Sequence, residues 1–182
     1  MPAIDGKKVA FLATDGVEQV ELDRPWQAVA DAGGQPELVS LDSGDIQAFN
    51  HLDKSDKKHV DTAIVDADAN SYDALVLPGG VANGDFVRSD ERAVRFVRRF
   101  ADAGKPIAVI CHGGWVLAEA DVVRGKTMTS WPSLKTDLRN AGATWVDKEV
   151  VTDNGLVSSR KPDDLDAFCA KLVEEVAEGA HV

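Results

Sequence analysis

The chain has 182 residues, of which 44% are hydrophobic and 28% charged, and its formal net charge at pH 7 is −11. A chain of this length folds as one domain and buries roughly 70% of its unfolded surface without needing disulfides or metals. Its acidic charge disfavours nucleic acids and anionic membranes, because both repel a negative surface. The composition therefore predicts one soluble domain over residues 1–182, with neither a nucleic acid nor a membrane as partner.

The compartment is indicated by the N-terminus, the hydropathy pattern and the cysteines. Residues 1–10 carry charged side chains and lack an apolar run before a cleavage site. The longest apolar stretch has about five residues, whereas a membrane-spanning helix needs about 20. Two cysteines, Cys111 and Cys169, make no disulfide framework and are typical of a reducing compartment. We therefore expect a cytoplasmic protein.

The first part of the chain predicts a βαβ unit followed by an irregular segment. Apolar runs predict buried strands at 9–13 and 37–41, and the stretch between them predicts a helix at 18–32. The connecting helix makes the two strands a parallel pair. The next segment is polar and poorly periodic, and we expect only short antiparallel pieces there, around 46–49 and 59–64.

The rest of the chain continues the alternation of strands and helices. The patterns predict, in chain order, strand 73–77, helix 90–103, strand 106–110, helix 115–120, strand 127–129 and a helix at 134–140 N-capped by Ser133. The turn Asp153-Asn154-Gly155 predicts a hairpin of strands 149–152 and 156–159, before a last helix at 162–178. This alternation predicts a doubly wound α/β sandwich with a mostly parallel central sheet.

The junction after the strand at 106–110 carries the strongest chemical signal. Cys111, His112, Gly113 and Gly114 stand between a buried strand and a helix. Open α/β sheets bind ligands at the carboxyl ends of their strands, and the free N–H groups of the following helix stabilise a thiolate or an oxyanion. The pattern predicts Cys111 as a nucleophile with a lowered thiol pKa, by the logic of a nucleophile turn. The alternative is an inert cysteine of the core.

Glu18 and the pair Gly79-Gly80 are expected at the same edge of the sheet. A protonated Glu18 carboxyl is able to donate a hydrogen bond to the thiolate. The alternative is that Glu18 only complements the helix dipole. The backbone N–H groups of Gly79, Gly80, His112 and Gly113 are candidates for an oxyanion hole. Alternatively, the glycine pair is only a turn and His112 is a structural histidine.

No pattern points to a metal or a cofactor. The two cysteines and four histidines lack the spacing of a metal site. Neither GxxxxGK[ST] nor GxGxxG, the phosphate-binding patterns, occurs in the sequence. We expect no metal and no cofactor, and a peptide or small molecule as the substrate.

Several motifs, ordered along the chain, resemble the ThiJ/PfpI superfamily and in particular its PfpI-type branch. The resemblance extends over nearly the whole chain, from about residue 8 to residue 172. Its carriers are DGVEQVEL at 15–22, ALVLPGG at 74–80, GKPIAVICHG at 104–113, TSWP at 129–132, DLRNAGA at 137–143, VSSR at 157–160 and PDDL at 162–165. The resemblance implies a flavodoxin-like fold related to class I glutamine amidotransferases.

The resemblance also implies roles for individual residues. The nucleophile falls on Cys111, the neighbouring histidine on His112 and the buried glutamate that contacts the thiol on Glu18. In PfpI-type proteases a third acidic residue comes from a neighbouring subunit, which falls here on Asp85 and implies a homodimer or larger homo-oligomer. Asp85 is shorter than the family's glutamate and lies in a longer loop, and Gly114 replaces a proline. We therefore expect peptide hydrolysis to be weak or absent.

Three functions remain open. A PfpI-type intracellular peptidase attacks peptide carbonyl groups through Cys111. A deglycase or glyoxalase attacks reactive aldehydes, such as methylglyoxal, or their protein adducts. In a redox sensor or protective stress protein, Cys111 is instead oxidised to sulfenic or sulfinic acid. Because all three use one reactive thiol, the sequence predicts a stress-related protein centred on Cys111 and leaves the reaction open.

Overall fold

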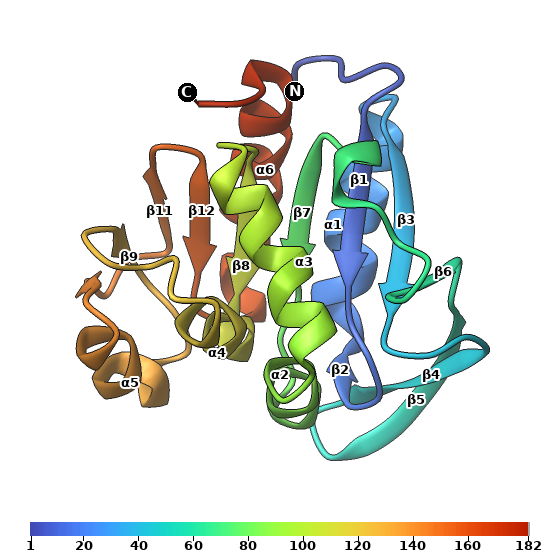
Figure 1. The fold of residues 1–182 in the computed structure, drawn as a ribbon, viewed down its shortest axis with the longest axis horizontal. Helices are drawn as coiled ribbons and strands as arrows, with labels where there is room; N and C mark the ends of the chain where they lie inside the picture. The colour runs from blue at the N-terminus through green and yellow to red at the C-terminus, as the bar shows by residue number, and fades with distance from the viewer. Residues whose placement is uncertain (182) are drawn as a thin grey trace.

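The computed structural model of the protein describes residues 1–181 (Figure 1). Over these residues the central sheet has seven strands in the order β11-β12-β8-β7-β1-β3-β6. In chain order they are β1 Lys8–Leu12, β3 Gln35–Ser40, β6 Thr62–Ala63, β7 Ala74–Leu77, β8 Ile107–Ile110, β11 Val150–Asp153 and β12 Leu156–Ser159. All neighbouring strands are parallel except β11 and β12. Those two form the predicted hairpin, with Asn154 and Gly155 at positive φ in its turn.

Helices cover both faces of this sheet (Figure 1). On one face α1 Gln19–Asp31 packs against α6 Leu165–Glu178. The other face carries α2 Val81–Arg88, α3 Glu91–Asp102 and α4 Gly114–Glu119, with α5 Lys135–Asn140 beside α4. Each face has its own cluster of buried apolar side chains, because the buried central strands present side chains to both sides. The predicted flavodoxin-like α/β sandwich is confirmed.

Two smaller sheets flank the core. One consists of β2 Val17–Glu18, β4 Asp45–Asn50 and β5 Asp53–His59, and the other pairs β9 Thr127–Met128 with β10 Thr144–Trp145. The strands β4 and β5 are antiparallel, as predicted for the irregular segment. The piece predicted at 59–64 is wrong in its pairing, because its strand β6 joins the edge of the main sheet parallel to β3.

The sequence predicts a loop after Gly80, but the structure has helix α2 there. The buried Asn83 side chain explains this helix. Its Oδ1 accepts a hydrogen bond of 2.8 Å from the Thr14 N–H, and its Nδ2 donates to the carbonyl oxygens of Pro78 and Gly79 at 3.1 and 3.0 Å. These bonds fasten α2 to the ends of two strands, so the helix depends on a polar anchor that hydrophobic periodicity does not reveal.

The predicted N-cap at Ser133 is wrong. Pro132–Leu134 form a 3-10 turn that continues into α5, and no side chain caps that helix. Similar 3-10 turns precede β7, α4 and α6, at Ala69–Ser71, Cys111–Gly113 and Pro162–Asp164. Three helices, α4, α5 and α6, are therefore preceded by 3-10 turns, and the turn before α4 carries the cysteine.

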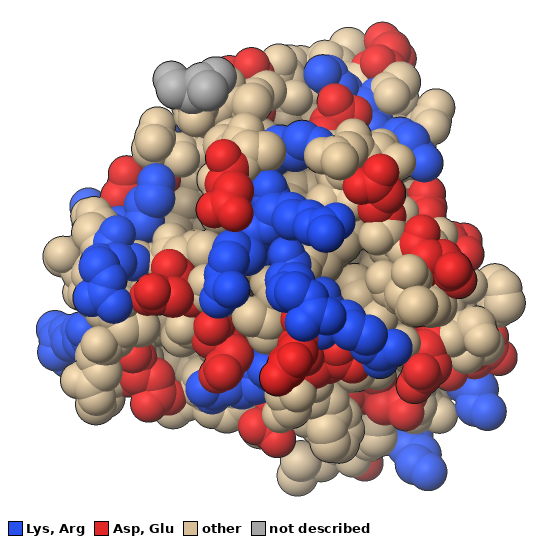
Figure 2. Space-filling model, in the orientation of Figure 1, with Lys and Arg blue, Asp and Glu red and all other residues tan. Residues whose placement is uncertain are grey.

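The surface charges are unevenly distributed. Lysine and arginine side chains gather over α3 on the face shown in Figure 2, with acidic side chains among them. Several of these arginines are ion-paired locally, as Arg92 is with Asp90 at 2.6 Å and Arg95 with Glu91 at 3.6 Å. Within residues 1–181, no helix combines the length and the apolar character that crossing a bilayer demands.

Candidate active site

Cys111 stands on a strained turn between β8 and α4. Its φ is +59°, a left-handed value that non-glycine residues seldom adopt. Behind it, a Cβ on Gly113 would lie only 2.6 Å from the Leu77 carbonyl oxygen, so only glycine fits there without displacement. The predicted junction at the carboxyl end of a buried strand is confirmed, and the cysteine lines a pocket at that edge of the sheet.

The carboxyl group beside the thiol belongs to Glu21, in the first turn of α1. Its side chain is fully buried, and its Oε2 accepts a hydrogen bond of 2.8 Å from the Gly79 N–H. A Cβ on Gly79 would clash with both this oxygen and the Cys111 side chain, so the two groups share a narrow space. The assignment of the thiol contact to Glu18 is therefore wrong by about one helical turn.

Burial controls the protonation of Glu21. Burial raises its pKa to about 8, helped by the negative charge of Glu18 and opposed by the hydrogen bond from Gly79. Glu21 is therefore a neutral carboxylic acid at neutral pH, able to donate a hydrogen bond to sulfur. A protonated glutamate beside the cysteine is what the sequence predicts, but at a different position.

The thiol of Cys111 does not have the predicted low pKa. Burial and the neighbouring Glu21 raise the pKa of Cys111, whereas the N–H groups of His112 and Gly80 act in the opposite direction. The prediction counted the helix N-terminus and the turn amides but underestimated the loss of hydration around the thiolate. A base is therefore needed to remove the thiol proton.

His112 is in position to be that base. Its Nδ1 lies 3.2 Å from the Cys111 Sγ. Burial lowers the imidazole pKa, so the ring is neutral near pH 7 and able to accept a proton. The ring stacks on Trp131 with centroids 5.7 Å apart and meets the edge of Trp115 at 5.2 Å. Aromatic contacts thus hold the imidazole, and the structure brings the two predicted residues Cys111 and His112 together.

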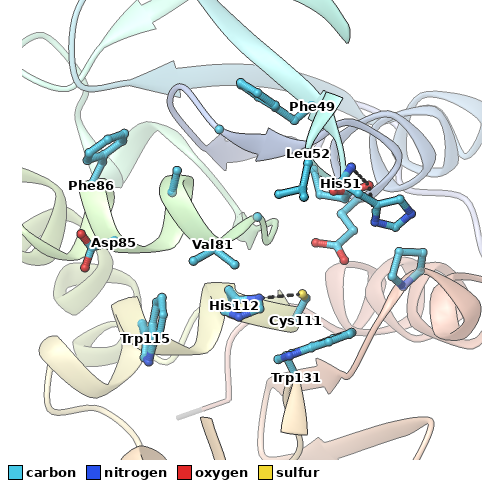
Figure 3. Close-up of a pocket in the computed structure, with 16 residues that line it drawn as sticks. Phe49, His51, Leu52, Val81, Asp85, Phe86, Cys111, His112, Trp115 and Trp131 are labelled. Atoms are coloured by element: carbon cyan, nitrogen blue, oxygen red, sulfur yellow. Dashed lines mark hydrogen bonds and ion pairs between the residues drawn. The ribbon is translucent and has the colours of Figure 1, made fainter. Parts of the chain in front are cut away.

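The other predicted acidic residues, Glu18 and Asp85, also line the pocket. Glu18, at the end of β2, accepts a hydrogen bond of 3.0 Å from the His51 N–H. Asp85 lies on α2, and Figure 3 shows it beside Phe86, across the pocket from Cys111. Within residues 1–181 no hydrogen bond joins the Asp85 carboxylate to His112. A single chain therefore brings together a thiol and an imidazole without an orienting carboxylate.

The four N–H groups predicted to form an oxyanion hole differ in what they contact. The Gly79 N–H is already bonded to Glu21, so its assignment to an oxyanion hole is wrong. The N–H groups of Gly80 and His112 are directed at the Cys111 sulfur. They remain candidates for binding the oxyanion that forms when the sulfur attacks a carbonyl carbon. A contribution from the Gly113 N–H stays a prediction.

The pocket around Cys111 has a volume of about 640 Å³ and mostly apolar walls (Figure 3). These walls come from the β4–β5 hairpin, α2, α4 and the turn before α5, and their large apolar members are Phe49, Leu52, Val81, Phe86, Trp115 and Trp131. Four of the six are notably exposed, with Leu52 at 94% the most. Sequence reasoning missed this wall because its members are far apart along the chain, although Trp131 lies within the TSWP motif.

Groups that could bind a metal lie elsewhere in the described part of the chain. Glu175, Glu178 and His181 form a cluster of three at the end of α6, where His181 Nε2 lies 2.8 Å from Glu175 Oε2. The His181 ring packs against Gly155, far along the chain from Cys111. The expectation of a site without metal or cofactor stays a prediction.

Comparisons with known proteins identify the family of the chain. A model of the DJ-1/PfpI family matches residues 7–175. The chain is 41% identical over 162 residues to "Putative cysteine protease YraA" of Bacillus subtilis (strain 168), covering 89% of this chain and 94% of that protein. It is 37% identical over 167 residues to "Deglycase PfpI" of Pyrococcus furiosus, covering 92% and 98% of the two chains.

A solved structure extends the likeness to three dimensions. A two-domain protein of Anabaena variabilis with DJ-1/ThiJ/PfpI-like and ferritin-like domains superposes with a TM-score of 0.87 and 32% identity. The match covers 94% of this chain but 48% of that one, so the present chain spans about half of its length. The names of the two relatives above describe different reactions, proteolysis for one and deglycation for the other.

Proposed function

The chain belongs to the DJ-1/PfpI family, in its PfpI-type branch, and on that premise we propose that it is an enzyme whose Cys111 adds to reactive carbonyl groups. The substrate class is that of reactive aldehydes and their adducts with protein amines, as the name deglycase says of one relative. The observation that carries the proposal is the buried set of Cys111, His112 and Glu21 at one end of the 640 Å³ pocket.

The proposed step is the addition of the thiol across a C=O bond. His112 Nδ1, 3.2 Å from Sγ, takes the thiol proton as sulfur forms a bond to the carbonyl carbon. The π electrons of the carbonyl move to its oxygen, which accepts hydrogen bonds from the N–H groups of Gly80 and His112 and then a proton from the imidazolium. Glu21, being neutral, adds no negative charge beside the attacking sulfur. The product is a hemithioacetal.

This reaction demands less of the site than peptide hydrolysis does. Cleaving an amide requires a proton donor held in line with the leaving amine, commonly oriented by a carboxylate. Within residues 1–181 His112 has no hydrogen bond to Asp85, and its ring is held by Trp131 and Trp115 instead. Addition to an aldehyde needs only the base, the nucleophile and donors for the oxygen.

Peptidase activity is the second candidate, favoured by the name of the relative from Bacillus subtilis. It would require a carboxylate from elsewhere, and we propose that a homo-oligomer is the form in which Asp85 could serve a neighbouring subunit. The exposed apolar side chains Leu52, Val81 and Phe86 line the same pocket as Asp85, which fits burial against a second copy. A reducing cytoplasm suits either reaction, because Cys111 must remain a free thiol.

The test compares wild type, Cys111→Ser and Asp85→Asn on three substrates: methylglyoxal with its amine adducts, fluorogenic peptides, and peroxide. We expect aldehyde or adduct turnover that Cys111→Ser abolishes and Asp85→Asn leaves within about twofold, with little peptide hydrolysis. Strong peptide hydrolysis lost in both variants would replace the proposal with the peptidase. Peroxide consumption alone would replace it with a redox role for Cys111.

A further inference from the structure

The fixed charges that line the pocket have one sign. Its lining includes the carboxyl groups of Glu18 and Asp85, in addition to the neutral Glu21, and contains no lysine or arginine. We infer that the pocket selects carbonyl compounds whose remaining part is cationic, such as those bearing an ammonium or guanidinium group, over anionic ones. The inference depends on the proposed function only in taking Cys111 as the reacting group.

Glu18 is the main source of this selectivity. Its side chain is only 12% exposed, and the one basic group within 4 Å of it among the described residues is the His51 ring, at 3.9 Å. Its charge raises the pKa of Glu21, and Glu21 in turn contacts Cys111, so Glu18 acts on the group next to the reacting sulfur. In a partly buried site such an attraction is screened far less than on an open surface.

The aromatic walls favour the same kind of ligand. Trp131 is 37% exposed at the pocket, and the faces of tryptophan attract cations. Trp115, the other indole of the wall, already has the Arg88 guanidinium 5.6 Å from its ring centroid. The aromatic wall next to the thiol is thus compatible with a positive group and contributes no cationic side chain for a negative one.

Two of the cations beside lining residues are ion-paired elsewhere. Arg88 is paired with Glu119 at 3.2 Å, and Lys161, beside the lining residue Pro162, with Asp163 at 3.5 Å. The basic residues seen in Figure 2 gather over α3. Asp85 also borders a neighbouring hollow that contains Arg88. Its charge is therefore partly offset, and we rank Glu18 above Asp85 as the determinant.

The experiment measures how fast Cys111 reacts with three methanethiosulfonates, which transfer a trimethylammonioethyl, a sulfonatoethyl or a methyl group. Each rate is followed by peptide mass spectrometry at about pH 7.2, where histidines are mostly neutral and Glu21, with its pKa of about 8, keeps its proton. It is then divided by that reagent's rate with 2-mercaptoethanol. We expect the normalised cation-to-anion ratio to be about 10 to 100 in the wild type. Cys111→Ser reports modification at any other position.

Three variants locate the source of the ratio. Glu18→Gln keeps an acceptor for the His51 N–H and removes the charge, so it should lower the ratio by about threefold or more. Asp85→Asn should lower it less. Glu91→Gln, at an exposed position on α3, changes the net charge equally and should leave the ratio unchanged.

A wild-type ratio near one, or equal shifts in Glu18→Gln and Glu91→Gln, would overturn the inference. Circular dichroism of Glu18→Gln checks that the fold is intact, and the methyl reagent checks that Cys111 remains accessible. Because these rates need no turnover, the outcome is independent of the proposed reaction. If the enzyme turns over carbonyl substrates but the rate ratio is near one, only this inference is wrong. If the ratio is high but no carbonyl substrate is turned over, only the proposed function is wrong.

Discussion

At Cys111 the reactivity of the sulfur depends on the charge that Glu21 carries, because the two side chains are buried together. While Glu21 is protonated it is a neutral donor to sulfur. Once it ionises, near pH 8, its negative charge opposes formation of a thiolate. The two groups therefore titrate as a pair, and the behaviour of the cysteine is best tested by changing the glutamate.

Glu21→Gln is expected to lower the pKa of the Cys111 thiol. Glutamine still accepts from the Gly79 N–H and still donates to sulfur, but it never becomes negative. Glu21→Leu loses the donor and leaves the Gly79 N–H unpaired, so its thiol pKa should exceed that of Glu21→Gln and its stability should fall by about 1–3 kcal/mol. The pH dependence of iodoacetamide alkylation measures both pKa values. Identical values in the two variants would show that Glu21 gives sulfur no hydrogen bond.

Cys111 should be alkylated well before Cys169. Both are buried, at 7% and 6% exposure, but only Cys111 lines the pocket. Burial raises the pKa of Cys169 to about 11, and its side chain is held in the cluster between α6 and the sheet without a base beside it. Limited labelling followed by peptide mass spectrometry measures the order. Equal labelling of both cysteines under native conditions would mean that access and His112 give Cys111 no advantage.

The choice between Glu18 and Glu21 shows where residue-scale prediction ends. The sequence places both at the carboxyl edge of the sheet, and they are three positions apart. Glu18 lies in the short strand β2 with extended dihedrals, φ −68° and ψ 114°, so it is not yet part of the helix. Only Glu21 is on the face of α1 that turns toward Gly79. A boundary shift of one or two residues therefore decides which carboxyl reaches the thiol.

At the scale of elements, prediction succeeds where apolar residues dictate the structure. β1, β7 and β8 are apolar runs, and the hairpin of β11 and β12 has an Asn-Gly turn, so both features can be read locally. Helix α2 cannot be, because the bonds of Asn83 that hold it come from residues far away along the chain. The pocket walls are hidden for the same reason, since they assemble from separate segments.

The turn that carries Cys111 should tolerate alanine at one glycine and not at the next. A Cβ at Gly113 would lie 2.6 Å from the Leu77 carbonyl oxygen, which is backbone of β7 and cannot move alone. At Gly114 a Cβ would meet only side chains, at 3.4 Å or more. Gly113→Ala should therefore cost about 2 kcal/mol or more, whereas Gly114→Ala should be neutral or gain up to about 1 kcal/mol from helix propensity.

Urea unfolding of the two glycine variants measures this difference. Both positions have helical backbone angles, with φ −58° at Gly113 and φ −57° at Gly114. The pair thus isolates the steric term from any cost of positive φ. Gly113→Ala should also slow the alkylation of Cys111, because the turn must shift. Equal free energies of unfolding for Gly113→Ala and Gly114→Ala would mean that the backbone of β7 shifts to make room for the extra methyl group.

For the whole molecule, the buried titratable groups give opposite contributions to stability as pH changes. The imidazole of His112 has its pKa lowered by burial, so below about pH 6.5 the unfolded chain binds a proton that the folded one does not, and stability rises with pH. Glu21 has the opposite effect, because it makes stability fall as pH rises. Its pKa is raised from the ordinary 4.5 to about 8, so above pH 4.5 the folded chain retains a proton that the unfolded one has lost.

The interval from about pH 7 to 8 therefore isolates Glu21, because His112 is mostly neutral there in both states and free thiols ionise mainly above it. Within this interval the unfolded chain binds fewer protons than the folded one, so the free energy of unfolding must fall as pH rises. The slope is about 1.4 kcal/mol per pH unit at the start of the interval, so the fall is about 1 kcal/mol over it, and the contribution of Glu21 levels off once it ionises in the folded state near pH 8. Glu21→Gln cannot ionise, so its free energy of unfolding should stay nearly constant between pH 7 and 8, while that of the wild type falls. Urea titrations of both proteins at half-unit pH steps measure the two slopes, with Glu91→Gln as a surface control that should keep the wild-type slope. If wild type and Glu21→Gln lose stability in parallel, the carboxyl of Glu21 does not hold its proton in the folded protein, and Cys111 reacts beside a charged rather than a neutral neighbour.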